Sequence, residues 1–350
     1  MRIAPFDGDA AEWDAFVAAT PGGTFCHLHA WRAVLADGLG HDLGLLAART
    51  GRELEGVLSL AAVRGPLGSF LVSVPFLNYG GAIGTRAART ELISHAVEEG
   101  RARGVDLVEL RRRTPAADAL AGGHDVPGLI PEVRVSDRRV TVVLPLPATA
   151  DELWDGFRSK LRAQVRRPMK EGMEARFGAD QTGPFYGVLA RNMRDLGTPV
   201  LPRRFFDAIV RGLPAEATIG VVYHEGRPAA GGFGFLWRGE LEMTWASAVR
   251  SLNRLAPNML LYWEFMRHAI GRGASTFNFG RCPPGGGTHR FKLQWGGVDE
   301  PLPWLQWSAS GAGGTPSPSS GRLALATRIW RRLPVRVATA LGPRIARTIP

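Results

Sequence analysis

The sequence predicts an α/β protein made of two similar lobes and a basic tail. Its 350 residues, 45% apolar and 21% charged, are enough chain to bury two cores of ordinary domain size. Strand-like and helix-like stretches alternate along most of the chain. Residues 91–111 and 264–281 repeat one pattern of helix, glycine stop, short strand and arginine, ending at Arg111 and Arg281. We therefore expect a duplicated lobe.

Changes in composition indicate where the lobes begin and end. The two lobes are predicted over residues 1–146 and 147–307. A stretch rich in proline, glycine and serine at 308–321 is typical of a linker, and residues 322–350 form the basic tail.

The first lobe shows strand and helix patterns in alternation. A turn at Gly51–Arg52 separates two long strands, and Thr85 is suited to cap a helix. The expected elements are a strand at 1–5, helices at 9–19 and within 24–40, strands at 41–50, 54–64 and 70–81, a helix at 85–104, and strands at 105–113 and 138–147.

The second lobe opens with a predicted helix over 149–167. Thr149 and Glu152 have the spacing of a capping box. Because an interior proline costs about 3 kcal/mol, Pro168 predicts that this helix ends or kinks near Arg167. The buried stripe of the helix would be Leu153, Phe157, Leu161 and Val165. Further helices are expected at about 182–195 and 202–212, and strands at 217–226, 227–237 and 240–249.

The stretch 245–295 is the centre of the second lobe. It reads as a strand, a helix capped by Asn258, a strand, and a glycine-rich loop at 285–287 that leads into a last strand. That last strand would carry His289 and Lys292 to the edge of a cleft.

Charge and cysteine content narrow the class of protein. The formal charge is +11, and seven arginines without an acid place +7 of it within residues 301–350. The basic character is therefore concentrated in the tail and one helix. Cys26 and Cys282 are far apart and lack the spacing of metal ligands, so they read as thiols in a reducing compartment, and no metal is expected.

Targeting segments are not visible in the sequence. Acidic residues, among them Asp7 and Asp14, occupy the region where a signal peptide has its apolar core. No run of 18 apolar residues is present. We expect a cytoplasmic protein. A peripheral position at the inner face of the cell membrane is also open.

Several motifs together resemble one family. The motifs N-x-L-L-x-W at 258–263, F-x-F-G-R at 277–281 and G-G-T-x-x-F-K-x-x-W-G at 286–296 resemble the second lobe of FemAB proteins. More narrowly, they resemble the FemAB-type proteins associated with exosortase and exopolysaccharide gene clusters. The stretches 75–81, 192–206 and 332–350 fit as well.

The resemblance implies a fold and an activity. It implies two tandem GNAT-like acyltransferase lobes, each a mixed sheet flanked by helices. It also implies transfer of an aminoacyl or acyl group onto an amine of a cell-envelope or exopolysaccharide precursor. The donor would be a co-substrate, aminoacyl-tRNA or acyl-CoA, and no bound cofactor is expected.

The chain departs from the family in ways that bear on the donor. The tRNA-binding coiled-coil arm of several relatives is not visible, which counts against aminoacyl-tRNA as donor. An ordinary acetyl-CoA enzyme needs free backbone N–H groups before its pyrophosphate-binding helix. Pro257 lies there and has no N–H, and the glycines at 80–85 are a weak substitute. A third departure is Asn278, where the family commonly has aspartate, so a base at this position is not supported.

Lys292 is the first catalytic candidate, because the Phe291–Lys292 pair matches the pair that lines the transfer site in the family. A cation aimed at a tetrahedral oxyanion is worth about 3–4 kcal/mol. The competing interpretation is a solvated lysine on an edge strand. His289 is a candidate general base near neutral pH. The competing interpretation is a loop histidine with no catalytic role.

A row of basic residues on the 149–167 helix is the candidate phosphate site. Arg158, Arg162 and Arg166 follow one another at helical spacing, with Lys170 next in line. They would hold phosphates of a nucleotide, a lipid diphosphate or tRNA, and a solvated helix face is the competing interpretation. The remaining substrate-binding candidates are Tyr79, Asn192, Asp195, Asn258 and Arg281, of which Tyr79 is equally suited to packing.

Two other functions remain open from the sequence. One is an acyl-CoA-dependent N-acetyltransferase, and the other is a non-catalytic protein that docks on anionic membrane or RNA. The tail is compatible with membrane docking, because a helix there mixes arginines with apolar residues, and the competing interpretation is a cap that packs on the lobes. The apolar residues concerned are Leu323, Leu325, Ile329, Trp330 and Leu333, with Arg328, Arg331 and Arg332 around them. The oligomeric state is open.

Overall fold

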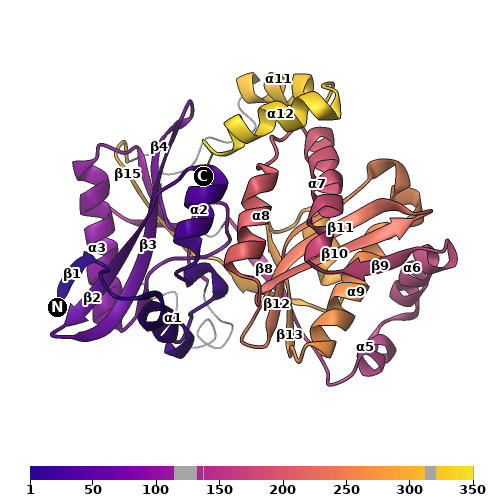
Figure 1. Ribbon diagram of the computed structural model, residues 1–350, viewed down its shortest axis with the longest axis horizontal. Coiled ribbons are helices and arrows are strands. Elements are labelled where there is room, and N and C mark those ends of the chain that lie inside the picture. The colour runs from indigo at the N-terminus through magenta and orange to yellow at the C-terminus, as the bar shows by residue number, and fades with distance from the viewer. Residues whose placement is uncertain (114–131, 137, 312–320, 350) are drawn as a thin grey trace. The chain divides into compact units, whose positions relative to one another are not determined.

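The computed structural model describes residues 1–113, 132–136, 138–311 and 321–349. The chain divides into two compact units. Unit 1 consists of Met1–Val140, Glu300–Pro318 and Arg347–Pro350, and unit 2 consists of Thr141–Asp299 and Ser319–Ala346. Both are α/β units in which helices cover a mixed sheet (Figure 1).

Unit 1 is built on a sheet with the strand order β1-β2-β3-β4-β6-β15-β7. Its strands are β1 (Arg2–Pro5), β2 (Leu43–Thr50), β3 (Glu53–Gly65), β4 (Gly68–Val72), β6 (Leu107–Leu110), β7 (Arg134–Ser136) and β15 (Trp304–Ser308), with the short β5 (Ile83–Gly84) beside β3. Its helices are α1 (Ala10–Ala19), α2 (Trp31–Leu39) and α3 (Arg86–Ala102), with a 3-10 turn η1 (Phe25–His27). Thr85 caps α3 as expected, accepting from the Ala88 N–H.

Unit 2 has the strand order β14-β8-β13-β12-β11-β10-β9. Its strands are β8 (Val140–Pro145), β9 (Glu174–Phe177), β10 (Ala217–His224), β11 (Arg227–Trp237), β12 (Glu240–Ala248), β13 (Thr276–Cys282) and β14 (Val298–Pro301). Its helices are α5 (Ala150–Gly156), α6 (Ser159–Lys170), α7 (Thr182–Leu196), α8 (Arg203–Gly212), α9 (Pro257–Gly271), α10 (Gly287–Leu293), α11 (Gly321–Trp330) and α12 (Val335–Ala346), with 3-10 turns η2 (Ala179–Gln181) and η3 (Arg250–Leu255).

The two sheets share one plan. In each, four antiparallel strands lead to a parallel pair, which is β4 with β6 in unit 1 and β12 with β13 in unit 2. In each, a long helix, α3 or α9, connects the parallel pair. The pattern of helix, glycine stop, strand and arginine that occurs twice in the sequence therefore reflects a repeated lobe.

The strand beside each parallel pair comes from the other half of the chain. β15 lies next to β6 in unit 1, whereas β8 lies next to β13 in unit 2. The division of the chain thus differs from the expected boundaries, because 138–146 was assigned to the first lobe and 304–307 to the second. Strand pairing over such a distance leaves no mark on local composition.

Adjacent glycines on β11 place helices on both faces of the unit 2 sheet. A Cβ on Gly231 would lie 3.2 Å from Phe185 of α7, and one on Gly232 would lie 2.8 Å from Phe265 of α9. Successive residues of a strand face opposite sides, so α7 and α9 cover opposite faces (Figure 1). Glycine is needed here because both helices approach the backbone closely.

Three helix predictions in unit 2 need correction. The helix expected over 149–167 is interrupted, because Phe157 is extended and ends α5, where its ring packs on Trp263. α6 continues through Pro168 to Lys170, with the proline ring buried near the helix end. Asn258 does not cap α9. Ala256 is the cap, at a positive φ, and Pro257 takes the first helical position, which suits its fixed φ.

The last strand expected after the glycine loop is instead the helix α10. His289, Lys292 and Trp295 are all buried, and their spacing of three residues is helical. The strand expected before the glycine loop is present as β13, and Phe277, Asn278 and Phe279 are all buried in it.

Candidate active site at the fork between β12 and β13

The parallel strands β12 and β13 separate part-way along their length. Their ladder joins residues 240–242 to 276–278 and ends there, although β12 runs on to Ala248 and β13 to Cys282. Beyond this point β12 pairs with β11 alone. Since alternate backbone groups of a strand point to each side, every second N–H of 243–248 is directed into the fork.

A β-bulge lies where the fork opens. Phe233 is opposite Trp245 and Gly234 is opposite Met243, which leaves Thr244 as the extra residue of β12. The Thr244 hydroxyl donates to Glu242 Oε1 at 3.0 Å. Bulges of this kind occur beside active sites, because they re-aim backbone and side-chain groups.

Lys292 reaches into the fork from α10. Its side chain is 3% exposed, and its Nζ donates to the carbonyl oxygens of Gly280 and Arg281 at the end of β13. Burial lowers the pKa of Lys292 to about 8, while the nearby Cys282 and Glu242 act in the opposite direction. A compact cation is thus fixed at the point where the two strands part.

An aromatic cluster holds α10 in this position. Tyr262 of α9 contacts the Phe291 ring at 5.0 Å between centroids and stacks on Phe279 at 5.6 Å. Trp295 contacts Phe157 at 5.5 Å. Phe291, named with Lys292 from the sequence, therefore packs against α9 and helps to orient the helix that carries the lysine.

Asn278 braces the closed end of the fork. Its Oδ1 accepts from the Thr141 hydroxyl and from the Gly280 N–H, while its Nδ2 donates to Glu240. The side chain is fully buried. These bonds use both the acceptor and the donor of an amide, which explains why asparagine suits this position.

His289 has both ring nitrogens engaged. Nδ1 accepts from the Gly285 N–H at 3.0 Å, so Nε2 carries the proton and donates to Asp299 at 2.8 Å. This arrangement ties the glycine loop to α10 and β14. In this geometry the ring has no nitrogen directed at a substrate.

The basic row lies along α6. Arg158 precedes the helix, Arg162 lies 3.8 Å from Asp155, and Arg166 lies over the Trp154 ring at 5.1 Å. Trp154 in turn contacts Trp263 of α9. Two of the three arginines are therefore partly engaged by α5, and the row is joined to the fork only through packed aromatic rings.

Most of the other candidates have structural contacts. Asn192 donates to Ser247 of β12, which fastens α7 to the sheet, whereas Asp195 pairs with its neighbour Arg194 within α7. The Arg281 carbonyl accepts from Lys292. Asn258 differs from the others: it lies in the first turn of α9, and its buried Oδ1 accepts no hydrogen bond from the described residues. Tyr79 belongs to unit 1, where it is buried with Arg113 over its ring.

The corresponding region of unit 1 is filled by its own chain. Ser73 N–H continues the ladder by donating to the Glu109 carbonyl, and the Ser73 hydroxyl accepts from Arg111 N–H. The Arg111 guanidinium pairs with Glu109 and donates to the Leu77 carbonyl. The repeated pattern that ends at Arg111 and Arg281 thus meets continued strand pairing in unit 1 and separated strands in unit 2.

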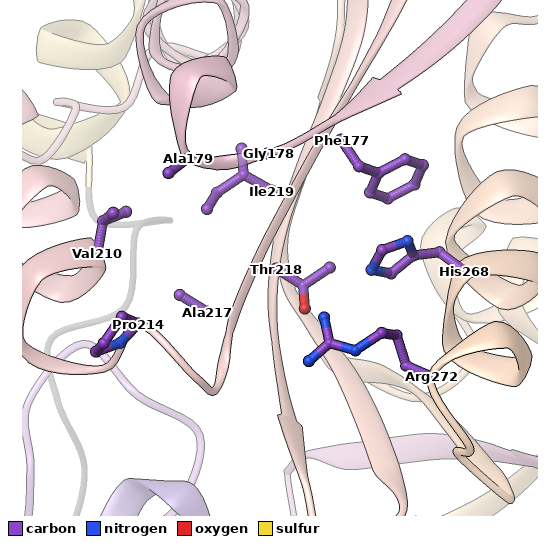
Figure 2. Close-up of a pocket in the computed structure, with 10 residues that line it drawn as sticks. All are labelled: Phe177, Gly178, Ala179, Val210, Pro214, Ala217, Thr218, Ile219, His268 and Arg272. Carbon is purple, nitrogen blue, oxygen red and sulfur yellow. The ribbon is translucent and has the colours of Figure 1, made fainter.

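A separate cavity of about 230 Å³ opens elsewhere in unit 2. Figure 2 shows the His268 ring lying flat against Phe177, with centroids 4.3 Å apart, and Arg272 beside them. Burial, then Arg272, lowers the pKa of His268. None of the lining residues belongs to the fork; they are Phe177, Gly178, Ala179, Val210, Pro214, Ala217, Thr218, Ile219, His268 and Arg272.

Comparison with known proteins identifies the architecture. Residues 155–293 match the family model described as the acetyltransferase (GNAT) domain. The matched segment contains the fork, its bulge and Lys292. Both units have the GNAT fold. No curated protein sequence matches the chain.

Three solved structures are similar to this chain in fold. The crystal structure of FemX shares 16% identity, covers 88% of this chain and 97% of its own, and has a TM-score of 0.63. A tandem GNAT protein from the clavulanic acid pathway shares 13%, covers 89% and 99%, and has a TM-score of 0.54. The C-terminal domain of a putative lysylphosphatidylglycerol synthetase from Agrobacterium fabrum shares 13%, covers 74% and 82%, and has a TM-score of 0.51.

Sequence reasoning missed Glu242 and Thr244. Nothing in the strand pattern at 240–249 shows where the ladder with β13 ends, so the two residues read as ordinary strand positions. The available signal was the acid Glu242 between apolar residues of a strand, because a buried acid needs a specific partner. Among the described residues no group of histidine, cysteine, aspartate and glutamate is arranged to hold a metal, and no helix is long and apolar enough to span a membrane.

Proposed function

We propose that the protein transfers an aminoacyl group from an ester donor to an amine at the β12–β13 fork of unit 2. The observation that carries this proposal is the position of Lys292, a buried cation at the bulged opening of a splayed parallel pair. The match to a GNAT domain over the same residues supports acyl transfer as the reaction class.

The chemistry needs an oxyanion to be stabilised. In an aminoacyl-tRNA donor the ester joins the amino acid to a ribose oxygen. The acceptor nitrogen attacks the ester carbon, the carbonyl oxygen becomes negative, and the bond to the ribose oxygen then breaks. The amine loses one proton and the ribose oxygen gains one. Backbone N–H groups of 243–248 and the fixed charge of Lys292 are the groups that would stabilise the negative oxygen.

The choice of lysine at 292 supports a chemical role. Of the 43 basic residues only Lys160, Lys170 and Lys292 are lysines, and the other two are exposed on α6. A lysine cation is compact and its pKa shifts on burial, unlike that of arginine. With a pKa of about 8, Lys292 stays mostly protonated at neutral pH, as an oxyanion partner requires.

The first turn of α9 favours a donor other than acyl-CoA. Ala256 N–H donates to Asn253 and Met259 N–H donates to Ala256, while Pro257 has no N–H. Few backbone donors therefore remain for a pyrophosphate at this helix end. An aminoacyl ester such as aminoacyl-tRNA has no need of this site, and its phosphates would contact Arg158, Arg162 and Arg166 of the α6 row.

The acceptor proposed is an amine on a cell-envelope or exopolysaccharide precursor. The motif resemblance to exopolysaccharide-associated FemAB proteins supports this choice. One structural neighbour is named the C-terminal domain of a putative lysylphosphatidylglycerol synthetase, and the activity in that name would attach an amino acid to a lipid.

A direct transfer assay tests the proposal. The full chain is incubated with a pool of isotope-labelled aminoacyl-tRNAs or with acetyl-CoA, and with an amino sugar and a lysine-ended peptide as amines. Mass spectrometry should detect a labelled amide with the tRNA pool. Amide formed only from acetyl-CoA would assign the protein to the N-acetyltransferases and contradict the aminoacyl donor. No amide from either donor would contradict transfer to these amines.

A further inference from the structure

The last two helices, α11 and α12, pack on unit 2 in an unusual orientation. α12 buries its small residues Ala338, Gly342 and Ala346, which are spaced by four along one face. A Cβ on Gly342 would lie only 2.9 Å from the Val200 backbone nitrogen. The small face thus allows α12 to lie close against α7 and the segment after it (Figure 1).

The large apolar residues of the same helices face solvent. Val337 and Leu341 of α12 are 41% and 42% exposed, and Leu325 and Ile329 of α11 are 59% and 56% exposed. Each pair is spaced by four residues, so each forms a row on its helix. Of the twelve exposed large apolar side chains in the described residues, five lie within 321–346.

Arginines surround these rows. Among the described residues, the exposed arginines of these helices that form no ion pair with an acid include Arg328, Arg332, Arg336 and Arg344. Residues 301–350 contain no aspartate or glutamate at all. The surface therefore combines exposed leucine, isoleucine and valine with uncompensated positive charge.

The pair of helices is fastened to unit 2 by polar contacts. Arg194 of α7 donates to the Leu333 carbonyl at 2.8 Å, and Arg331 donates to the Leu196 carbonyl. Leu196 is the last residue of α7. The helices are thus held in place by one face while the other is presented to solvent.

We propose that α11 and α12 dock unit 2 on an anionic lipid bilayer. An interfacial helix inserts leucine and isoleucine side chains among the lipids, and its arginines pair with anionic headgroups. RNA would use the arginines but not the apolar rows. A second copy would bring arginines against arginines at a self-complementary interface. This inference does not depend on the proposed reaction, since it rests on α11 and α12 alone.

Vesicle co-sedimentation of the full chain tests the proposal. The probes are vesicles of phosphatidylcholine with or without one third phosphatidylglycerol, at low salt and at 0.5 M salt. Arg328→Gln with Arg336→Gln should weaken binding about 30-fold, at about 1 kcal/mol for each charge. Leu325→Ser with Ile329→Ser should weaken it by about tenfold or more, because the inserted area is lost.

Matched controls separate this surface from general effects. Arg52→Gln with Arg227→Gln removes two exposed arginines of the sheet turns, and Val135→Ser with Val298→Ser removes two exposed apolar side chains of strands. Both pairs should bind vesicles like the wild type. Thermal melting of every variant shows whether it is folded.

Four results would overturn the proposal. They are no sedimentation with phosphatidylglycerol, equal binding to vesicles without it, equal loss in the control pairs, and a dimer in the absence of lipid that the Leu325/Ile329 variant abolishes. Tighter binding to RNA than to vesicles at equal phosphate, unchanged in the Leu325/Ile329 variant, would assign the surface to nucleic acid instead.

Discussion

At the level of single side chains, His27 shows how burial couples the stability of unit 1 to pH. Its Nδ1 accepts from the Thr24 N–H, and its Nε2 donates to the Gly81 carbonyl, which holds the loop after β4. Burial lowers the pKa of His27 to about 4, from an ordinary value of 6.5. A proton on Nδ1 would remove the acceptor for Thr24.

We predict that unit 1 loses stability as pH falls from 6.5 to 4. In this window His27 binds a proton in the unfolded chain but not in the folded one. The free energy of unfolding therefore falls by about 3 kcal/mol over the whole window. Hydrogen exchange of the β2 and β3 amides at pH 7 and 4.5 measures the loss. In His27→Gln the part due to this group should vanish, and an unchanged pH dependence in that variant would show that His27 is not responsible.

Asn278 gives a second prediction, for the brace of unit 2. Asn278→Asp removes the Nδ2 donor to Glu240 and places a buried carboxylate beside an acid. We expect a loss of about 3 kcal/mol at pH 7, and partial recovery at pH 5 as the new carboxyl group binds a proton. Melting temperatures at both pH values test this, with the exposed Asn253→Asp as control. Equal melting of the two variants would contradict the brace.

The residues of the fork were only partly accessible to sequence reasoning. Lys292 and Phe291 were named because they lie in a contiguous motif. Glu242 and Thr244 were not, because the end of a strand ladder and the position of a bulge depend on pairing with residues far away in sequence. The buried state of Lys292 was also missed, since a last strand at the edge of a cleft was expected where α10 forms.

At the scale of helices and strands, the contact of α12 with α7 depends on the absence of a side chain at Gly342. Gly342→Leu places atoms against the Val200 backbone, at 2.9 Å and 3.2 Å from its nitrogen and oxygen for the Cβ alone. We expect α12 to lift away at a cost of about 2 kcal/mol.

Hydrogen exchange across α12 is the measurement for this prediction. Its amides should exchange faster in Gly342→Leu than in Ala340→Leu, which adds the same side chain on the exposed side. If both variants protect α12 equally, the close packing at Gly342 is not what holds the helix.

Elements with strong local signals were predicted well, and those decided by tertiary contacts were not. Thr85 and Thr149 cap their helices as expected, since capping depends on the next three residues. The break at Phe157 follows from the packing of its ring on Trp263 and Trp295, which the helical spacing of Leu153, Phe157 and Leu161 conceals. α10 has few residues, and its glycine-rich start favours neither helix nor strand.

For the whole molecule, the sheet of unit 1 depends on β15, a strand from the last part of the chain. β15 lies between β6 and β7, and Leu305 and Trp307 are buried in the unit 1 core. A chain that ends at Asp299 should therefore fail to form unit 1, whereas one that ends at Ser310 keeps β15 and should form it.

Limited proteolysis with peptide mapping distinguishes these outcomes. Peptides from β2 and β3 should be protected in the chain ending at Ser310 and cleaved rapidly in the chain ending at Asp299. Equal protection would show that unit 1 does not need β15. The duplicated fold was predicted from a local pattern repeated twice, but the exchanged strands β8 and β15 were not, because nothing local distinguishes the sheet that each one joins.

The most direct test of the account is the transfer rate of Lys292→Met, compared with Lys160→Met on exposed α6. Methionine leaves the Gly280 and Arg281 carbonyls without their donor, so we expect a loss of about 1–3 kcal/mol in stability. The assay is therefore run well below the melting temperature of the variant. The account predicts that folded Lys292→Met discharges aminoacyl-tRNA to an amine about 100-fold or more slowly than the wild type, with Lys160→Met unchanged. A folded Lys292→Met that transfers at the wild-type rate would contradict it.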